Sequence, residues 1–121
     1  MTETLSVGLE GEQTFTVTRE MSPPHLPVPV LSTPTMVQQI EQTCLLSVQP
    51  LLEEGLTTVG THICDSHARA AAEGQEVTVH SRLTEINKRR LTFDVIVDGP
   101  AGRLSEGTHQ RTVVDFRRMA G

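Results

Sequence analysis

Several functional classes require residues that this sequence lacks. It contains no tryptophan, no tyrosine and three phenylalanines. Modules that bind single-stranded nucleic acid stack bases on aromatic side chains, so the composition argues against that class. Lysine and arginine total 10 against 15 aspartates and glutamates, which gives a net charge of −5. This charge argues against nucleic acid or an anionic membrane surface as the main partner.

Signals for membranes, secretion and metals are also missing. No apolar run approaches the roughly 20 residues that span a bilayer, and residues 1–12 lack the basic and apolar regions of a secretory signal. Cys44 and Cys64 form neither a disulfide framework nor a zinc motif. We therefore expect a single domain over residues 1–121, soluble and cytoplasmic, with no metal ion and no cofactor.

Strand-forming residues dominate what is present. Valine and threonine together supply 29 of the 121 residues, which favours strands. Alternating apolar residues predict strands over about 12–20, 57–71, 75–87, 90–98 and 103–116. In two of them one face is apolar or small, formed by Val77, Val79, Ser81 and Leu83, and by Leu91, Phe93, Val95 and Val97. Residues 21–34 carry five of the seven prolines and are predicted to form an extended loop.

One helix is predicted, over about 34–53. Its apolar stripe consists of Val37, Ile40, Cys44, Leu45 and Val48, with Glu41 among them. Thr33 followed by Pro34 predicts an N-cap followed by proline in the first turn, and Pro50 predicts a bend or an end. One long helix against an antiparallel sheet is an α+β sandwich. Its thin aliphatic core favours oligomerisation.

Five residues in these elements have both a structural and a functional interpretation. Glu41 is either a stripe-edge residue that reaches water or a carboxylate that needs a partner. His67, among alanines, is either a solvent-facing strand histidine or the neighbour of a ligand. Thr33 either caps the helix or offers a hydroxyl at the positive end of its dipole. Gly60 marks a bulge or a close approach of ligand to backbone, and Arg111 is a surface residue or an anion clamp.

Pattern alone does not separate His67 from the other histidines of the predicted strands. His62, His80 and His109 are equal candidates on this ground. The choice of His67 depends on the resemblance described next.

Three stretches of the chain carry that resemblance: VLSTPTMVQQIEQTC, LLEEGLTTVGTHICDSHARAAAEGQEVTV and GTHQRTVV. Over about residues 28–116 they resemble the fluoroacetyl-CoA thioesterase family. The resemblance implies a single, dimeric hot-dog domain, in which a five-stranded antiparallel sheet wraps around one long helix. It implies hydrolysis of an acyl-CoA thioester at the dimer interface.

The resemblance also implies roles for individual residues. The family's catalytic threonine, glutamate and histidine match Thr33, Glu41 and His67. The substrate-binding glycine, whose N–H contacts the thioester carbonyl, matches Gly60, and the arginine near the acyl end matches Arg111. Attack by the glutamate itself and attack by a water that it activates both fit these residue types.

The loop before the helix departs from the family pattern. It is rich in proline and lacks the phenylalanines that form the acyl-pocket lid of the fluoroacetyl-specific enzyme. Aliphatic walls select mainly by size, so we predict a small or polar acyl group and no strong discrimination for fluorine. Arg111 adds a carboxylated acyl chain as an option.

Two other functions stay open at this point. One is a non-catalytic, acyl-CoA-binding hot-dog dimer. The other is a hydratase or dehydratase, which would also use a histidine and a carboxylate. In every case the expected partners are acyl-CoA and further copies of the chain, in a dimer or a tetramer, without nucleic acid or membrane.

Overall fold

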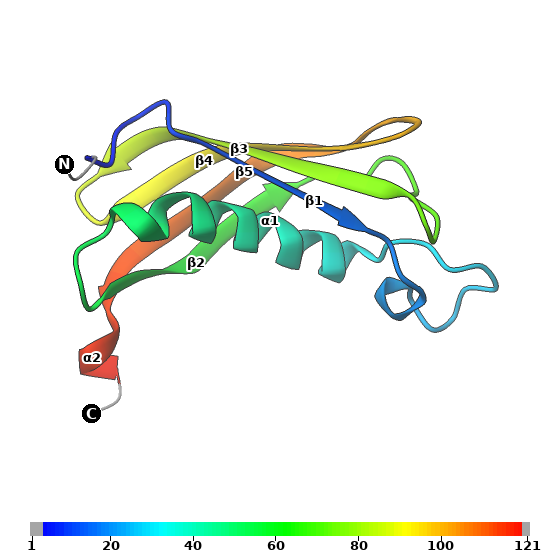
Figure 1. The fold of residues 1–121 in the computed structure, drawn as a ribbon, viewed down its shortest axis with the longest axis horizontal. Coiled ribbons are helices and arrows are strands. Elements are labelled where there is room, and N and C mark those ends of the chain that lie inside the picture. The colour runs from blue at the N-terminus through cyan, green and yellow to red at the C-terminus, as the bar shows by residue number, and fades with distance from the viewer. Residues whose placement is uncertain (1–3, 120–121) are drawn as a thin grey trace.

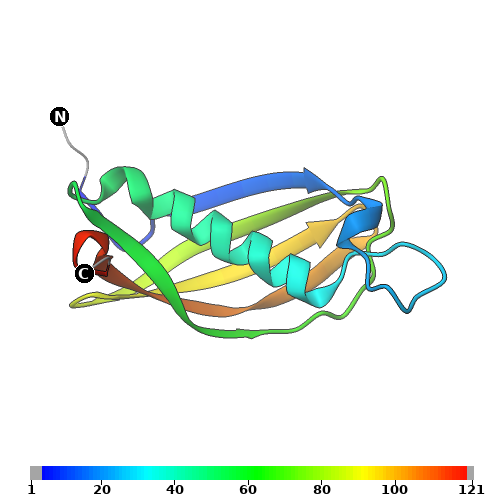
Figure 2. The same ribbon diagram turned by 90° about the horizontal axis from the view of Figure 1, so that it is seen from below.

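The computed structural model describes residues 4–119 as one curled sheet around one long helix. The strands are β1 (Glu10–Thr16), β2 (Leu56–Asp65), β3 (Glu76–Asn87), β4 (Arg90–Gly99) and β5 (Gly102–Asp115). They pair antiparallel in the order β1-β3-β4-β5-β2. Helix α1 (Thr33–Val48) lies along one face of this sheet (Figures 1 and 2). The predicted hot-dog architecture is confirmed.

Short helical turns complete the chain. They are η1 (Arg19–Met21), η2 (Gln49–Leu51) and the C-terminal α2 (Phe116–Met119). Within residues 4–119, no helix is long and apolar enough to cross a membrane.

The inner faces of β3 and β4 form much of the core. All eight residues predicted to share a face are buried: Val77, Val79, Ser81, Leu83, Leu91, Phe93, Val95 and Val97. The remaining core side chains are almost all aliphatic, and Phe93 is the largest that is fully buried. Strands β3, β4 and β5 begin and end within one residue of their predicted bounds. Period-two alternation was therefore sufficient to place them.

Helix α1 differs from its prediction at both ends. It ends at Val48 instead of residue 53, and the chain continues as the tighter turn η2. Pro50 explains this end, because a proline has no N–H to donate to the preceding turn. The N-cap is Ser32, whose Oγ accepts from the Thr35 N–H at 3.3 Å. The prediction that Thr33 caps the helix is therefore wrong, and Thr33 is its first residue.

The buried stripe of α1 is rotated from the predicted one. The fully buried positions are Met36, Ile40, Thr43, Cys44 and Val48. Val37, Glu41 and Leu45 are partly exposed. Glu41 thus lies at one edge of the buried stripe, and its side chain is partly exposed.

Strand β2 is shorter than predicted. It ends at Asp65 instead of residue 71, so His67 lies beyond the strand and the prediction of a strand histidine is wrong. The Ser66 and Ala68 N–H groups still donate to β5, but in an irregular path. Alanine has little strand preference, so the alanine-rich stretch after His67 does little to extend the ladder.

The proline-rich segment before α1 is irregular, as predicted, and it is anchored near its end. The Leu31 N–H donates to the Ala71 carbonyl at 2.8 Å, and the Glu73 N–H donates to the Pro29 carbonyl at 3.1 Å. A single bridge joins Val30 to Ala72. These bonds place the loop against the segment that carries His67.

Candidate active site

Thr33 and His67 meet at the start of α1. Thr33 Oγ1 lies 2.7 Å from His67 Nδ1, although the two residues are 34 positions apart. Because Ser32 caps the helix, the Thr33 hydroxyl is available for this contact. The structure therefore brings together two of the three residues predicted to be catalytic.

A cavity of about 300 Å³ lies beside this pair. Its other lining residues are mostly apolar and come from the proline-rich loop and from the segment after β2: Pro23, Leu26, Val30, Leu31, Ser32, Ala68, Arg69 and Ala70. A small, mostly apolar cavity with a few polar side chains, here Ser32, Thr33, His67 and Arg69, is a typical binding site for a short ligand group.

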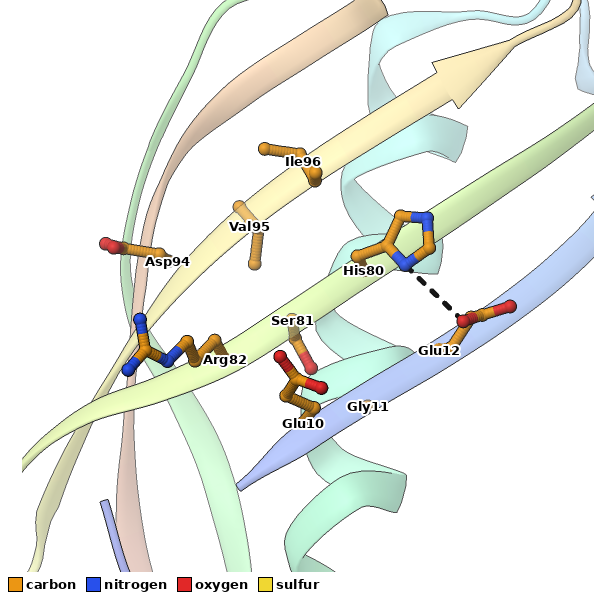
Figure 3. Close-up of a pocket in the computed structure, with 9 residues that line it drawn as sticks. All are labelled: Glu10, Gly11, Glu12, His80, Ser81, Arg82, Asp94, Val95 and Ile96. Atoms are coloured by element: carbon orange, nitrogen blue, oxygen red, sulfur yellow. Dashed lines mark ion pairs between the residues drawn. The ribbon is translucent and has the colours of Figure 1, made fainter. Parts of the chain in front are cut away.

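A larger hollow, of about 450 Å³, lies over β1, β3 and β4 (Figure 3). In Figure 3 the helix runs behind these strands, so the hollow is on the outer face of the sheet. On this face His80 Nδ1 lies 3.5 Å from Glu12 Oε2. None of the five predicted site residues lines this hollow.

Glu41 belongs to a second polar group, further along α1. Its side chain is 43% exposed, and its Oε1 lies 3.7 Å from Arg111 Nη1. The same oxygen packs against Gly60, where a Cβ would overlap it. Both interpretations of Glu41 therefore apply: it lies at the edge of the buried stripe, and its carboxylate has a charged partner.

Gly60 lies at a β-bulge. The pairing of β2 with β5 shifts register between Gly60 and His62, while Gly60 itself pairs with Arg111. The bulge interpretation is confirmed. The missing side chain leaves space for the Glu41 carboxylate, so the glycine has a steric role.

Arg111 is buried, not at the surface. It is 5% exposed, and its Nε and Nη2 donate to Thr58 Oγ1 at 2.7 Å and to the Thr58 carbonyl at 3.0 Å. Burial lowers the pKa of Arg111, and the nearby Glu41 partly offsets that effect. A guanidinium remains charged despite such a shift, so Glu41 faces a fixed cation.

Sequence reasoning did not select His109, which joins this second group. It is 1% exposed, and its ring stacks near Phe93 with centroids 6.3 Å apart. Its Nε2 lies 3.1 Å from Arg111 Nη1. Position 109 shares the inner face of β5 with position 111, so strand alternation from Arg111 would have found it.

The two polar groups are separated along the helix. Thr33 and Glu41 are eight residues apart, which corresponds to about 12 Å of helix rise. Between Glu41 and His67 of one chain, the structure of residues 4–119 has no hydrogen bond or ion pair. Their approach across subunits, or through substrate, stays a prediction.

Neither a further reactive nucleophile nor a metal site emerges from the residues that the structure describes. Burial raises the pKa of the Cys44 thiol to about 12, so it stays protonated and unreactive. In the part of the chain that the structure describes, no three His, Cys, Asp or Glu side chains are placed to hold a metal ion.

Asp65, at the end of β2, has a carboxylate whose two oxygens are buried without a cation. Neither oxygen meets hydrogen-bond geometry with any described group. Burial raises the pKa of Asp65 to about 6, and the Thr108 N–H, which lies nearby but outside hydrogen-bond geometry, offsets this only in part. The native state therefore binds this proton more tightly than the unfolded state does, and stability falls as the pH rises from about 4 through 6.

We expect Asp65→Asn to stabilise the protein at pH 8 and to have little effect at pH 4. The amide removes the cost of ionising a buried carboxylate. That cost is about 1 kcal/mol after allowance for partial exposure, or about 4 °C in Tm. Thermal unfolding at both pH values measures it, with the exposed Asp94→Asn as control. An equal Tm gain at both pH values would contradict the ionisation argument.

The chain is similar in sequence to known fluoroacetyl-CoA thioesterases. A family model described as fluoroacetyl-CoA-specific thioesterase matches residues 12–117. The fluoroacetyl-CoA thioesterase of Streptantibioticus cattleyicolor is 34% identical over 90 residues, which cover 74% of this chain and 65% of that protein. The match thus spans just under two thirds of that relative's length.

Solved structures agree with the sequence matches. A structure of the fluoroacetyl-CoA thioesterase FlK is similar with a TM-score of 0.91 at 28% identity, covering 98% of this chain and 94% of that one. A mutant of FlK solved with fluoroacetate and CoA gives a TM-score of 0.88 at 29% identity, covering 95% and 99%. A thioesterase superfamily member from Thermus thermophilus, 24% identical, shares the fold, with a TM-score of 0.84 and coverage of 95% and 93%.

Proposed function

Because the chain belongs to the fluoroacetyl-CoA-specific thioesterase family, we propose that it hydrolyses acyl-CoA thioesters to a free acid and CoA. The observation that carries this proposal is the 2.7 Å contact of Thr33 with His67 beside a small aliphatic cavity. Hydrolysis of a thioester needs a base or nucleophile, a proton shuttle and donors for the oxyanion. Glu41, His67 and the Gly60 N–H are the groups that we assign to these three tasks.

We infer that each site combines two subunits. Proton transfer requires hydrogen-bond contact or one bridging water, whereas Glu41 lies about two helical turns from the Thr33–His67 pair of its own chain. A two-fold partner supplies the missing carboxylate if it docks along β2. That strand is an edge of the sheet, and its residues 60–64 are exposed. An exposed edge strand invites pairing with a second copy.

In this site the reaction proceeds in balanced steps. The partner subunit's Glu41 attacks the carbonyl carbon or removes a proton from a water that attacks it. The carbonyl oxygen takes the negative charge and accepts from the N–H of the partner subunit's Gly60, because Gly60 lies beside Glu41 of its own chain. The C–S bond then breaks, His67 delivers a proton to the CoA sulfur, and Thr33 holds the ring through Nδ1. In the direct route, the proton that Glu41 removed from water then passes to His67 and restores both groups. In the covalent route, a water attacks the resulting anhydride, gives a proton to His67 and frees Glu41. Water thus supplies the second carboxylic oxygen and the thiol proton in either route.

Arg111 acts on Glu41 in this proposal, and we do not assign it to a substrate carboxylate. Its three guanidinium nitrogens already face Thr58, His109 and Glu41. A malonyl-type acyl chain would compete with these contacts. Six of the ten described residues that line the cavity are apolar, which supports a short, uncharged acyl group, and Arg69 is the one cationic side chain among these ten.

The test is thiol release from a panel of acetyl-, fluoroacetyl-, propionyl-, malonyl- and phenylacetyl-CoA. We expect turnover of the short uncharged substrates, weak activity on malonyl-CoA, and kcat/KM for acetyl and fluoroacetyl within about tenfold. Aliphatic walls distinguish groups that differ by a whole methylene by about 1–3 kcal/mol, and acetyl and fluoroacetyl differ by less than that in volume. A fluoroacetyl preference of several orders of magnitude would contradict this view of the pocket. CoA binding without thiol release from any substrate would contradict the enzymatic proposal.

A further inference from the structure

The inner face of β5 presents His109 and Arg111 side by side, directly behind Glu41. Both side chains are buried. Arg111 Nη1 has two neighbours, His109 Nε2 at 3.1 Å and Glu41 Oε1 at 3.7 Å. One nitrogen of the guanidinium therefore connects the histidine to the carboxylate.

The partners of His109 fix its protonation and its tautomer. His109 Nδ1 lies 2.7 Å from the His62 carbonyl oxygen, which only accepts hydrogen bonds. Nδ1 must therefore carry the hydrogen. Arg111 Nη1 only donates, so His109 Nε2 must be the unprotonated acceptor. The neutral Nδ1–H form is the one that satisfies both neighbours.

Arg111 is in turn held at all three guanidinium nitrogens. Thr58 accepts from Nε and Nη2, through its hydroxyl and its carbonyl, and His109 accepts from Nη1. A planar guanidinium held in this way has one orientation. In that orientation its Nη1 faces Glu41.

We propose that His109 is a positioning residue of the hydrolytic site, whose unprotonated Nε2 holds the Arg111 guanidinium against Glu41. The inference rests on the proposed function for its kinetic consequence. Without this acceptor, Thr58 alone would hold the guanidinium along its other edge, and Nη1 would keep only its 3.7 Å approach to Glu41, so the position of the cation would be less well fixed. The carboxylate would then be less well placed for attack or for proton removal.

The electrostatic surroundings of His109 favour the neutral ring. Burial lowers its pKa, the His62 carbonyl raises it, and the charge of Arg111 lowers it again. Glu41 on α1 favours the charged ring, and the His62 side chain on β2 opposes it, both with smaller effects. Protonation of Nε2 would place two cations in contact and remove the acceptor that Arg111 uses.

Two amide substitutions of His109 test its contact with His62 and its contact with Arg111 separately. His109→Asn places an amide near the position of Nδ1, so it can still donate to the His62 carbonyl but cannot reach Arg111. His109→Gln extends an amide oxygen to the position of Nε2, where it can accept from Arg111. We expect kcat to fall about ten- to a hundredfold in the asparagine variant, with KM little changed, and to recover to within several-fold in the glutamine variant. His80→Asn, on the outer face, is the matched control.

Failure of this inference and failure of the proposed function give different results. Wild-type protein that releases no thiol from the substrate panel would contradict the function alone. For that case, and for a variant that does not fold, ring-nitrogen NMR of wild-type His109 tests the inference directly. We expect a ring protonated at Nδ1 that titrates below its ordinary value. Protonation at Nε2, titration at the ordinary value, or a wild-type kcat in folded His109→Asn would overturn the inference.

Discussion

Glu41→Gln should lower kcat for acyl-CoA hydrolysis by about a hundred- to ten-thousandfold and leave acyl-CoA binding nearly intact. Glutamine keeps the shape of the side chain but neither removes a proton nor attacks a carbonyl carbon. The amide is also neutral, so the fixed charge of Arg111 behind it loses its counterpart. Thiol-release kinetics and equilibrium binding of a slow substrate measure the two effects separately.

A matched pair of inactive variants tests where the carboxylate comes from. In a mixed dimer of Glu41→Gln and His67→Asn subunits, the proposed two-chain site would be intact once and doubly altered once. Activity should therefore reappear when the two proteins are mixed and exchange subunits. Folded mixed dimers that stay inactive would place Glu41 and His67 in one subunit, and wild-type turnover by Glu41→Gln would remove Glu41 from the mechanism.

Thr33→Ala should reduce kcat about ten- to a hundredfold, whereas Thr33→Ser should keep most of the activity. The serine retains the hydroxyl that faces His67 Nδ1 at 2.7 Å, and the alanine leaves that ring without its partner. Neither change should alter thermal stability greatly, because Thr33 does not cap the helix.

Ser32→Ala is the matched control for the capping role. It removes the oxygen that accepts from the Thr35 N–H, and it should cost about 1 kcal/mol of stability. A loss of stability in Thr33→Ala as large as that in Ser32→Ala would return Thr33 to a structural role. Equal kcat in the alanine, serine and wild-type proteins at position 33 would do so too.

The sequence alone was sufficient for the parts of the fold that depend on local periodicity. The apolar faces of β3 and β4 follow from alternation, because a half-buried antiparallel strand repeats every two residues. The helix could be located but not oriented. Its apolar residues lie on two adjacent flanks, one through Ile40 and Cys44 and one through Val37 and Leu45, and only packing against the sheet decides which is buried.

The errors have equally specific causes. Ser32 and Thr33 are both good capping residues, and Pro34 fits either of the first two helical positions, so the sequence Ser-Thr-Pro leaves the start uncertain by one residue. The contact of Thr33 with His67 depends on how the segment after β2 returns to the helix. Local pattern has no information on that path. The resemblance to a known family supplied both residues instead.

His109 illustrates a third limit. A histidine in a strand has no distinctive local pattern, and its importance comes from three neighbours: His62 on β2, Phe93 on β4 and Arg111 on its own strand. Alternation from Arg111 places His109 on the inner face of β5, but the bulge at Gly60 shifts the register of β2 against β5, so the contact with His62 could not be predicted from strand positions alone.

The anchored proline-rich loop has a consequence for how the pocket responds to ligands. Prolines have preset backbone angles, and bonds from Leu31 and Glu73 hold the loop to its neighbour before any substrate arrives. Binding therefore orders little additional chain, and the loop has few alternative conformations that would accommodate a larger acyl group. The volume of such a pocket changes little from one substrate to the next. Affinity should rise with each methylene that still fits the cavity and then drop abruptly at the first acyl group that exceeds it.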